Sequence, residues 1–168
     1  MTKLETATHV CLIGLCCLAA GLLIEQRFFP PAPSTSSARN LVGQKVDLPG
    51  ANWQAAPLSV VLQISSTCHF CQESIPFYQQ LMATRDSQAA KVPVIVASAD
   101  AVAVMRQYLE DHQVAVDEVL HSRLGAFHTG TPTIFIVDSR GIVKRVFVGE
   151  LDPSGQKQLL SIVERGRV

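Results

Sequence analysis

Short apolar runs and helix-like segments alternate along residues 41–168, and this alternation limits the possible folds more than any other feature of the chain. Residues 60–64, 94–97, 134–137 and 142–148 are predicted strands, because each is a short run rich in apolar and β-branched side chains. Residues 71–82, residues 100–111 and a last segment that opens at Asp152-Pro153 place apolar side chains at helical spacing. The order β-α-β-α-β-β-α predicts an α/β fold with helices on the faces of the sheet.

Three acidic residues mark the ends of these elements. Asp138-Ser139-Arg140-Gly141 is a predicted hairpin turn, so the last two strands are expected to be antiparallel and the sheet mixed. Asp100 is the predicted N-cap of the helix over residues 100–111. Asp152 is the predicted N-cap of the last helix, with Pro153 at its first position.

Residues 1–40 have a different composition from the rest of the chain. Residues 10–24 (VCLIGLCCLAAGLLI) carry no charge, and with the three residues before them they approach the length of a short membrane span. The apolar run continues past Ala19 and Ala20, where a signal peptidase could act, so an uncleaved anchor over residues 1–26 is preferred to a cleaved signal peptide. Residues 27–40 are rich in Pro and Ser and are a predicted linker. Residues 41–168 are then a domain held at the membrane outside the cytoplasm.

Charge and cysteine content exclude several classes of protein. The chain has 14 basic and 14 acidic residues, and the basic ones are not clustered, which argues against a nucleic-acid partner. Three of the five cysteines, Cys11, Cys16 and Cys17, lie in the apolar run and are expected to act there as small apolar residues. The remaining two, Cys68 and Cys71, cannot form the several bridges of a small disulfide-rich domain.

Cys68 and Cys71 lie between the first predicted strand and the first predicted helix. Cys68 comes just before the helix, where unpaired N–H groups and the helix dipole favour the thiolate. His69, when protonated, would add positive charge and make the pair more oxidising. Cys71 lies deeper, where it can attack a mixed disulfide formed at Cys68. The motif therefore predicts a redox pair that forms a Cys68–Cys71 disulfide and needs neither cofactor nor metal.

Two other interpretations of the C-x-x-C motif are weaker. It is often half of a zinc site, but the chain has no second cysteine pair. His121 and His128 are separated by six residues, outside the spacing of a zinc-finger histidine pair. Two inert core cysteines are also disfavoured, because the neighbouring Ser, Thr and His residues are polar.

Thr131 and Pro132 precede the third predicted strand. A proline that enters a strand usually marks an edge or a turn. Here a cis proline beside the cysteines is the better interpretation, because it would bring backbone close to them. The Thr131 backbone is then expected to pair with an extended segment of substrate near Cys68.

Together these motifs resemble the TlpA/ResA-like branch of the thioredoxin superfamily, the membrane-tethered extracytoplasmic thiol–disulfide oxidoreductases. The resemblance spans residues 41–168 and is carried by the C-x-x-C motif, Pro76 five residues after Cys71, Gly130-Thr131-Pro132-Thr133, the turn at residues 138–142 and Gly149. It implies a thioredoxin fold, a central mixed sheet flanked by helices, with a helix kinked at Pro76. It also implies protein thiols and disulfides as substrates and a separate redox partner, unidentified by the sequence, that recycles the pair.

The sequence departs from this family at several places. Thr67 and Phe70 occupy positions where the family usually has Trp and often has Pro. Many relatives carry a buried acid or an Asn on the strand before the motif, and this strand offers Gln63, which does not titrate. Glu73 is expected to be a solvated residue of the first helical turn. The shared motifs therefore predict the fold, and both redox directions, reductase and oxidase, stay open.

Two alternative functions use the same cysteines. A copper-binding assembly factor of thioredoxin fold would use Cys68, Cys71 and His128, since thiolates and imidazole suit copper. Such factors resemble C-x-x-x-C rather than C-x-x-C, which counts against it. A thiol peroxidase would use Ser65 three residues before Cys68, but the proline expected four residues earlier than Ser65 is Val61 here.

Overall fold

The computed structural model describes residues 40–122, 124 and 130–168. The predicted anchor, residues 1–26, lies outside these residues, as do nearly all of the predicted linker and His128. Within the described part of the chain, no helix has both the length and the apolar character needed to cross a bilayer. In chain order the elements are η1 (Trp53–Ala55), β1 (Leu58–Gln63), α3 (His69–Glu73), α4 (Ile75–Asp86), β2 (Val94–Ser98), α5 (Val102–Asp111), β3 (Glu118–His121), β4 (Thr133–Asp138), β5 (Val143–Val148) and α6 (Pro153–Arg165).

The described strands form one mixed sheet of five, in the order β3-β2-β1-β4-β5. β2 runs parallel to β1 and to β3, and β4 is antiparallel to β1. β4 and β5 are antiparallel, as the hairpin at residues 138–141 predicted. β1 lies at the centre and is buried along its whole length. Its last residue, Gln63, pairs with Thr133, the first residue of β4. The loop that leaves β1 and the loop that enters β4 are therefore brought to the same edge of the sheet.

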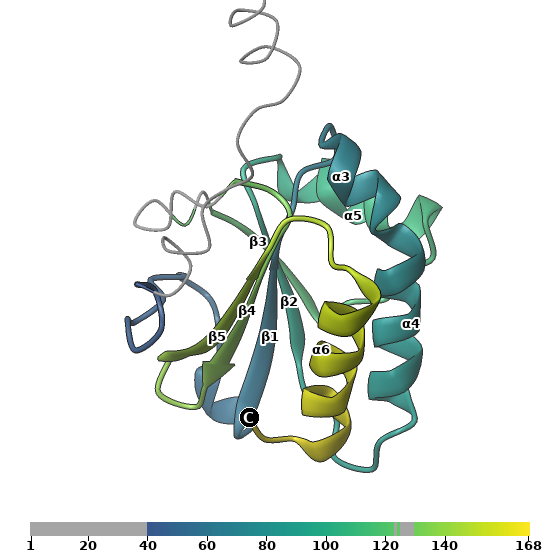
Figure 1. Ribbon diagram of the computed structural model, residues 1–168. Coiled ribbons are helices and arrows are strands. Elements are labelled where there is room, and N and C mark those ends of the chain that lie inside the picture. The colour runs from purple at the N-terminus through teal and green to yellow at the C-terminus, as the bar shows by residue number, and fades with distance from the viewer. Residues whose placement is uncertain (1–39, 123, 125–129) are drawn as a thin grey trace, which may run out of the picture. The chain divides into compact units, whose positions relative to one another are not determined.

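α4, α5 and α6 pack their apolar side chains on one face of this sheet. α4 and α6 lie side by side there (Figure 1). Val60 and Leu62 of β1 point toward the helices, and Val61 points to the opposite face, because alternate strand residues face opposite ways. The opposite face is covered by the segment before β1, including Val46 and Trp53. Burial of each large apolar side chain stabilises the fold by about 1.5–3 kcal/mol.

The helix predicted over residues 71–82 is divided at Ser74 into α3 and α4. Pro76 explains the break, because it has no N–H to donate to the carbonyl of Gln72 and its ring crowds that carbonyl. Helical hydrogen bonding resumes at once, since the Tyr78 N–H donates to the Ser74 carbonyl at 3.0 Å. The kink that the family resemblance implied at Pro76 is therefore a break between two helices, just after the cysteines.

Two further sequence-based expectations can be compared with the structure. Asp152 caps α6 as predicted, since its Oδ1 accepts from the Gly155 N–H at 2.7 Å. Asp100 does not cap α5, which has Ala101 as its N-cap. That prediction was wrong because the Asp100 carboxylate is bound to another loop, described below. Strand β3 was not predicted, because its four residues (EVLH) contain only two apolar side chains, which is too short a run to indicate a strand.

Arg85 on α4 is a buried cation that holds the far end of the fold together. Its guanidinium donates to Asp117 Oδ2 at 2.7 Å and to the Ala115 carbonyl at 2.9 Å. Asp117 Oδ2 also accepts from the N–H of Val94, the first residue of β2.

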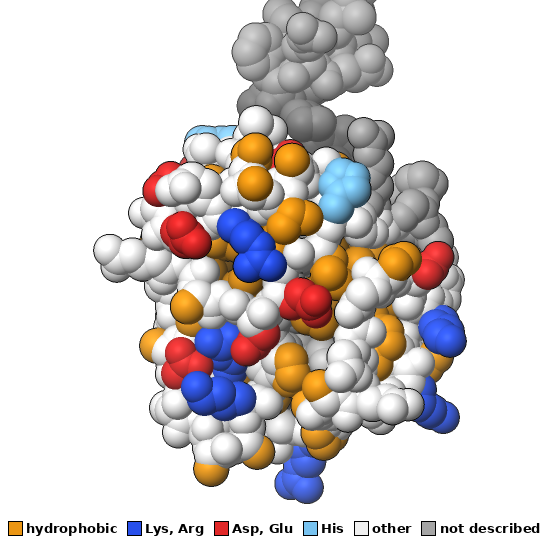
Figure 2. Space-filling model, turned by 180° about the vertical axis from the view of Figure 1, so that it is seen from behind, with side chains coloured by type: hydrophobic (Ala, Val, Ile, Leu, Met, Phe, Trp, Pro, Cys, Tyr) orange, Lys and Arg blue, Asp and Glu red, His pale blue; other side chains and the backbone are white. Residues whose placement is uncertain are grey.

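On the face of the molecule shown in Figure 2, acidic and basic side chains lie interspersed, so this face has no patch of a single sign.

Candidate active site

Cys68 is the N-cap of α3, in extended backbone conformation directly before the helix. Its Sγ accepts a hydrogen bond from the Cys71 N–H at 3.4 Å, as a capping side chain does with the third residue of a helix. The Cys68 N–H donates to the Ser65 carbonyl at 3.2 Å, which fixes the turn before the helix. Cys68 is partly exposed and Cys71 is buried, so the outer sulfur is the one that a substrate can reach.

The two thiols differ in acidity. Partial burial acts to raise the pKa of Cys68. Hydrogen bonds from the side chains of Cys71 and Thr131 and from the backbone of Cys71 and Phe70 outweigh it, so the pKa is lowered. Burial raises the pKa of Cys71 to about 12, and its hydrogen bond to Cys68 acts in the same direction. The thiolate of the pair is therefore held at Cys68, and Cys71 stays protonated.

The loop before β4 meets the pair from the other side. The Thr131–Pro132 peptide bond is cis, as the sequence predicted. The Cys68 Sγ–H donates to the Thr131 carbonyl oxygen at 3.3 Å, so this backbone lies beside the outer sulfur. The Pro132 carbonyl accepts from the Gly149 N–H at 2.8 Å, and the Thr133 hydroxyl donates to the Gly130 carbonyl at 3.0 Å. The first bond ties the loop to the residue that follows β5, and the second closes the loop around Thr131.

His69 lies on the outer surface of α3, and 74% of its side chain is exposed. Its Nε2 is 3.2 Å from Oε1 of Glu73, one helical turn later. Glu73 was expected to be solvated only, so this pairing is an addition to the sequence-based view of the site. The imidazole is directed at Glu73, and any charge that it supplies to Cys68 is shared with that carboxylate.

Asp100, between β2 and α5, binds the loop that leads to Cys68. Its Oδ2 accepts from the Ser66 N–H at 2.7 Å and from the Ser65 hydroxyl at 3.3 Å. The hydrogen bond from the Ser66 backbone lowers the pKa of Asp100, which keeps it charged at neutral pH. Sequence reasoning missed this contact, since the partners are more than thirty positions apart.

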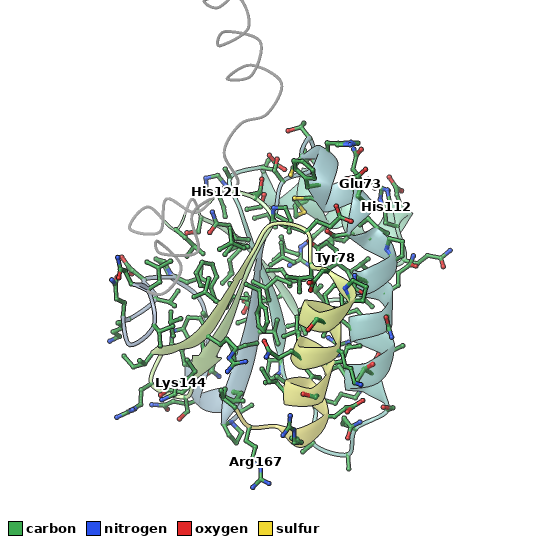
Figure 3. All side chains as sticks on the ribbon, in the orientation of Figure 1. Glu73, Tyr78, His112, His121, Lys144 and Arg167 are labelled. Carbon is green, nitrogen blue, oxygen red and sulfur yellow. The ribbon has the colours of Figure 1, made fainter. Side chains whose placement is uncertain are left out.

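Beneath Cys71 the helix-covered side of the sheet contains Tyr78, which is fully buried between α4 and the sheet (Figure 3). Its hydroxyl has no hydrogen-bond partner among the described residues. Burial, followed by the nearby charge of Cys71, raises the pKa of Tyr78. Leu58, Val60 and Leu62 of β1 share this core with Cys71, whereas Gln63 points to the opposite face because strand residues alternate. Gln63 therefore does not face Cys71, as the buried acid or Asn of the family would be expected to do.

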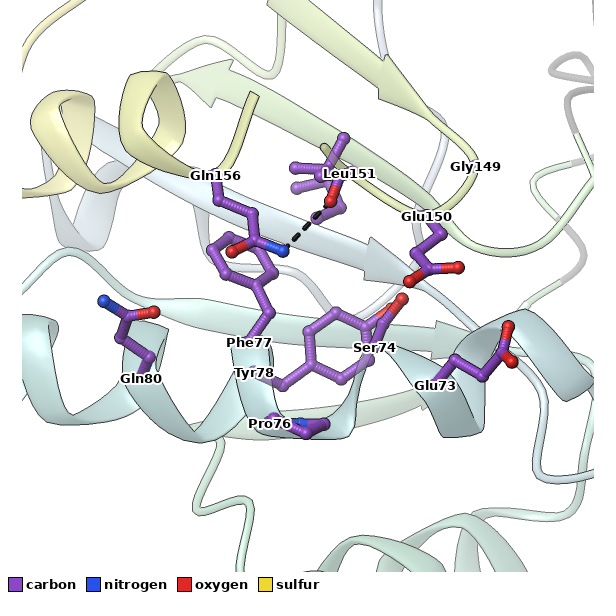
Figure 4. Close-up of a pocket in the computed structure, with 11 residues that line it drawn as sticks. Glu73, Ser74, Pro76, Phe77, Tyr78, Gln80, Gly149, Glu150, Leu151 and Gln156 are labelled. Atoms are coloured by element: carbon purple, nitrogen blue, oxygen red, sulfur yellow. Dashed lines mark hydrogen bonds between the residues drawn. The ribbon is translucent and has the colours of Figure 1, made fainter. Parts of the chain in front are cut away.

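A small cavity of about 160 Å³ adjoins the site between the start of α4 and the chain that leaves β5 (Figure 4). Glu73 and Ser74 form one wall, and Gly149 and Glu150 form another. The amide of Gln156 donates to the Leu151 carbonyl at 2.9 Å across one end. Neither cysteine lines this cavity, so the reacting sulfurs lie outside it.

The residues of the two alternative functions are only partly described. Among the residues that the structure describes, no group of three His, Cys, Asp or Glu side chains is placed to hold a metal ion. His128, the third ligand of the copper hypothesis, lies outside those residues. The Ser65 hydroxyl of the peroxidase hypothesis is engaged with Asp100 and lies 3.2 Å from the Thr67 hydroxyl.

No protein-family model and no curated protein sequence matches this chain. Solved structures do. A thiol:disulfide interchange protein of the thioredoxin family from Chlorobium tepidum TLS is 19% identical, with a TM-score of 0.51 over 67% of this chain and 82% of that one. A thiol-disulfide isomerase from Corynebacterium glutamicum is 19% identical, with a TM-score of 0.54 over 73% and 91%. A secreted thiol-disulfide isomerase from the same organism is 13% identical, with a TM-score of 0.52 over 67% and 71%.

The chain has the thioredoxin fold. Its described residues place a mixed five-stranded sheet, with helices packed on it, behind a loop that carries Cys68 and Cys71. At these identities the likeness establishes the thioredoxin fold, and the function has to be argued from the site.

Proposed function

We propose that this protein exchanges disulfides with protein thiols, using Cys68 as the attacking sulfur and Cys71 as the resolving one. The observation that carries the proposal is the difference between the two thiols. Cys68 is partly exposed with a lowered pKa, and Cys71 is buried with a raised pKa, one turn into the helix. A nucleophilic thiolate with a protected second thiol is the arrangement that a dithiol exchange needs.

The exchange proceeds in two balanced steps. The Cys68 thiolate attacks one sulfur of a substrate disulfide, a Cys68–substrate bond forms, and the other substrate sulfur leaves as a thiolate. Cys71 then gives its proton to the substrate thiolate released in the first step and attacks the Cys68 sulfur, which forms the Cys68–Cys71 disulfide and releases the second substrate sulfur as a thiolate. Two electrons pass from the pair to the substrate. For the protein to act as a reductase, a separate dithiol partner must then reduce the Cys68–Cys71 disulfide. For it to act as an oxidase, the same steps run in reverse and a substrate dithiol is oxidised.

Thr131 and Pro132 are the proposed substrate-binding residues. The Thr131 carbonyl is 3.3 Å from the Cys68 sulfur, where it accepts a bond that a substrate backbone N–H can replace. An extended substrate segment would then lie along this loop with its sulfur directed at Cys68. His69 is the proposed tuning residue, since it adjoins Cys68 in sequence and pairs with Glu73.

We also propose that the domain works outside the cytoplasm, tethered by residues 1–26. The apolar run at residues 10–24 and the Pro- and Ser-rich residues after it support this placement. One of the structurally similar proteins is described as secreted, which is consistent with an oxidising compartment. Recovery of the full chain in the membrane fraction, resistant to salt and alkaline washing, is the expected outcome.

A trapping experiment tests the exchange itself. In the full chain, Cys71→Ser should accumulate mixed disulfides through Cys68, because the resolving step is lost, and mass spectrometry would identify the bound proteins. Cys68→Ser is the matched control and should trap none. Alkylation of the reduced wild type at pH 7 should label Cys68 ahead of Cys71. Equal trapping by both variants would contradict the assignment of roles, and earlier labelling of Cys71 would reverse it.

A further inference from the structure

Asp100 lies 34 positions from the loop that it binds, and it is itself fixed on both sides. Its N–H donates to the Ser98 hydroxyl at 3.1 Å, and Ser98 is buried at the end of β2. Its carbonyl accepts from Nδ1 of His121, at the end of β3, at 3.0 Å. The Asp100 backbone is thus anchored to the ends of two neighbouring strands. A carboxylate on such a support has a defined position from which to hold another loop.

The partner of this carboxylate is the turn that delivers Cys68. Asp100 Oδ2 accepts from the Ser66 N–H at 2.7 Å and from the Ser65 hydroxyl at 3.3 Å. The Ser65 carbonyl in turn accepts from the Cys68 N–H at 3.2 Å. A continuous path of hydrogen bonds therefore runs from the anchored Asp100 through Ser65 to the backbone of Cys68.

We propose that Asp100 is a positioning residue for the thiol–disulfide exchange, which holds the loop of Ser65 and Ser66 so that Cys68 caps α3. The inference rests on the proposed function and adds to it a residue that touches neither substrate nor sulfur. Its action is indirect. With the loop fixed, the Cys68 sulfur meets the Cys71 N–H and the Thr131 carbonyl together, and without it the sulfur loses that alignment.

A purely electrostatic role for Asp100 makes the opposite prediction. The carboxylate is negative, so its charge alone disfavours a thiolate at Cys68, and removing the charge should lower the Cys68 pKa. Loss of positioning removes the helix-capping hydrogen bond and should raise the Cys68 pKa toward its free value of about 8.5. The sign of the change therefore separates the two roles.

Two substitutions separate charge from hydrogen bonding. Asp100→Asn keeps an amide oxygen that can accept from Ser66 and Ser65 but removes the charge. Asp100→Ala removes both. Glu110→Ala is a matched control, because it removes an exposed carboxylate near the C-terminal end of α5, ten residues after Asp100. The readouts, taken on the reduced full chain, are the pH profile of Cys68 alkylation followed on its own peptide and the rate of reaction with a small aromatic disulfide.

Positioning predicts that Asp100→Ala raises the alkylation midpoint of Cys68 and slows the exchange by about tenfold or more, as misplacement of a reacting group does. Asp100→Asn should retain most of the rate, and Glu110→Ala should match the wild type. A lowered midpoint in both Asp100 variants, or an unchanged Asp100→Ala, would overturn the proposal.

Failures of folding and of the proposed function can be recognised separately. If Asp100→Ala does not fold by circular dichroism, Ser65→Ala takes its place, because it removes one donor to the carboxylate and leaves the Ser66 bond. Ser65→Ala should raise the midpoint in the same direction by a smaller amount, and an unchanged midpoint would count against positioning. A wild type that exchanges with no disulfide would instead refute the proposed function.

Discussion

At the residue scale the site is organised around a single sulfur. Cys68 receives the Cys71 N–H, lies beside the Thr131 carbonyl and is connected through Ser65 to Asp100. All of these groups are polar atoms of the backbone or of small side chains. The lowered pKa of Cys68 is thus produced by hydrogen bonding at a helix start and not by a neighbouring basic residue.

The surface pair of His69 and Glu73 gives the prediction for redox potential. Charge that stabilises the Cys68 thiolate stabilises the reduced form and makes the disulfide more oxidising. His69→Ala should therefore lower the potential, and Glu73→Gln should raise it by releasing the imidazole and removing a negative charge. Each shift should be on the order of 10 mV, since exposed charge pairs contribute about 0.2–1 kcal/mol and about 30 mV corresponds to 1.4 kcal/mol.

Equilibration with glutathione buffers measures these potentials. The wild type is expected above the potential of thioredoxin, about −270 mV. If the wild type is as reducing as thioredoxin and both variants have the same potential as the wild type, His69 does not tune the redox pair, and the protein is better regarded as a dedicated reductase.

The residues of the site that could be predicted from the sequence are those whose role is local. Cys68, Cys71 and the cis bond before Pro132 are marked by their own neighbours in the chain. Asp100 could not be identified, because its role depends on a loop 34 positions away and its own neighbours favoured a helix cap. The binding roles of Thr131 and Pro132 remain predictions.

At the scale of elements, the same limit applies to the fold. The alternation of strands and helices was confirmed, because periodicity is a local property of each segment. Strand β3 was not predicted, because Glu118–His121 forms a strand by pairing with β2 and has no apolar run of its own. The mixed sheet followed from the turn at Asp138, whose Oδ1 accepts from the Arg140 and Ile142 N–H groups.

Arg85 gives the prediction at this scale. It is 5% exposed and joins α4 to Asp117 and to the Ala115 carbonyl. Arg85→Ala should lower the free energy of unfolding by about 2 kcal/mol, below the 3–5 kcal/mol of a fully buried pair because Asp117 is partly exposed. The network is remote from the cysteines, so the exchange rate per folded molecule should not change.

Urea denaturation of the two proteins measures this loss. Arg106→Ala on α5 is the control, since Arg106 is exposed, and it should stay within about 0.5 kcal/mol of the wild type. If both variants are equally stable, the buried guanidinium has no net stabilising effect and the prediction is wrong, because removal of one partner of a buried ion pair should be destabilising.

At the scale of the whole molecule, the two cysteines link the stability of the fold to pH in opposite directions. The pKa of Cys68 is lower in the folded state than in the unfolded chain, so ionisation of this thiol stabilises the fold. This stabilisation is complete above the unfolded pKa of about 8.5 and is lost as the pH falls through the folded pKa. Cys71 has a folded pKa raised to about 12, so the unfolded chain ionises first and stability is lost as the pH rises from about 8.5 toward 12. The reduced protein should therefore be most stable near the free thiol pKa.

The two serine variants isolate these effects. In the reduced state, Cys68→Ser should abolish the rise in stability on the acid side of this maximum, and Cys71→Ser should abolish most of the fall on its alkaline side. A residual fall above about pH 10 is expected in both, because burial raises the pKa of Tyr78 as well and unfolding frees that phenol to ionise. Urea midpoints measured under reducing conditions between about pH 6 and pH 11 test the scheme. The opposite assignment, in which Cys71→Ser flattens the acid side, would mean that the inner cysteine carries the thiolate and that the order of attack is reversed.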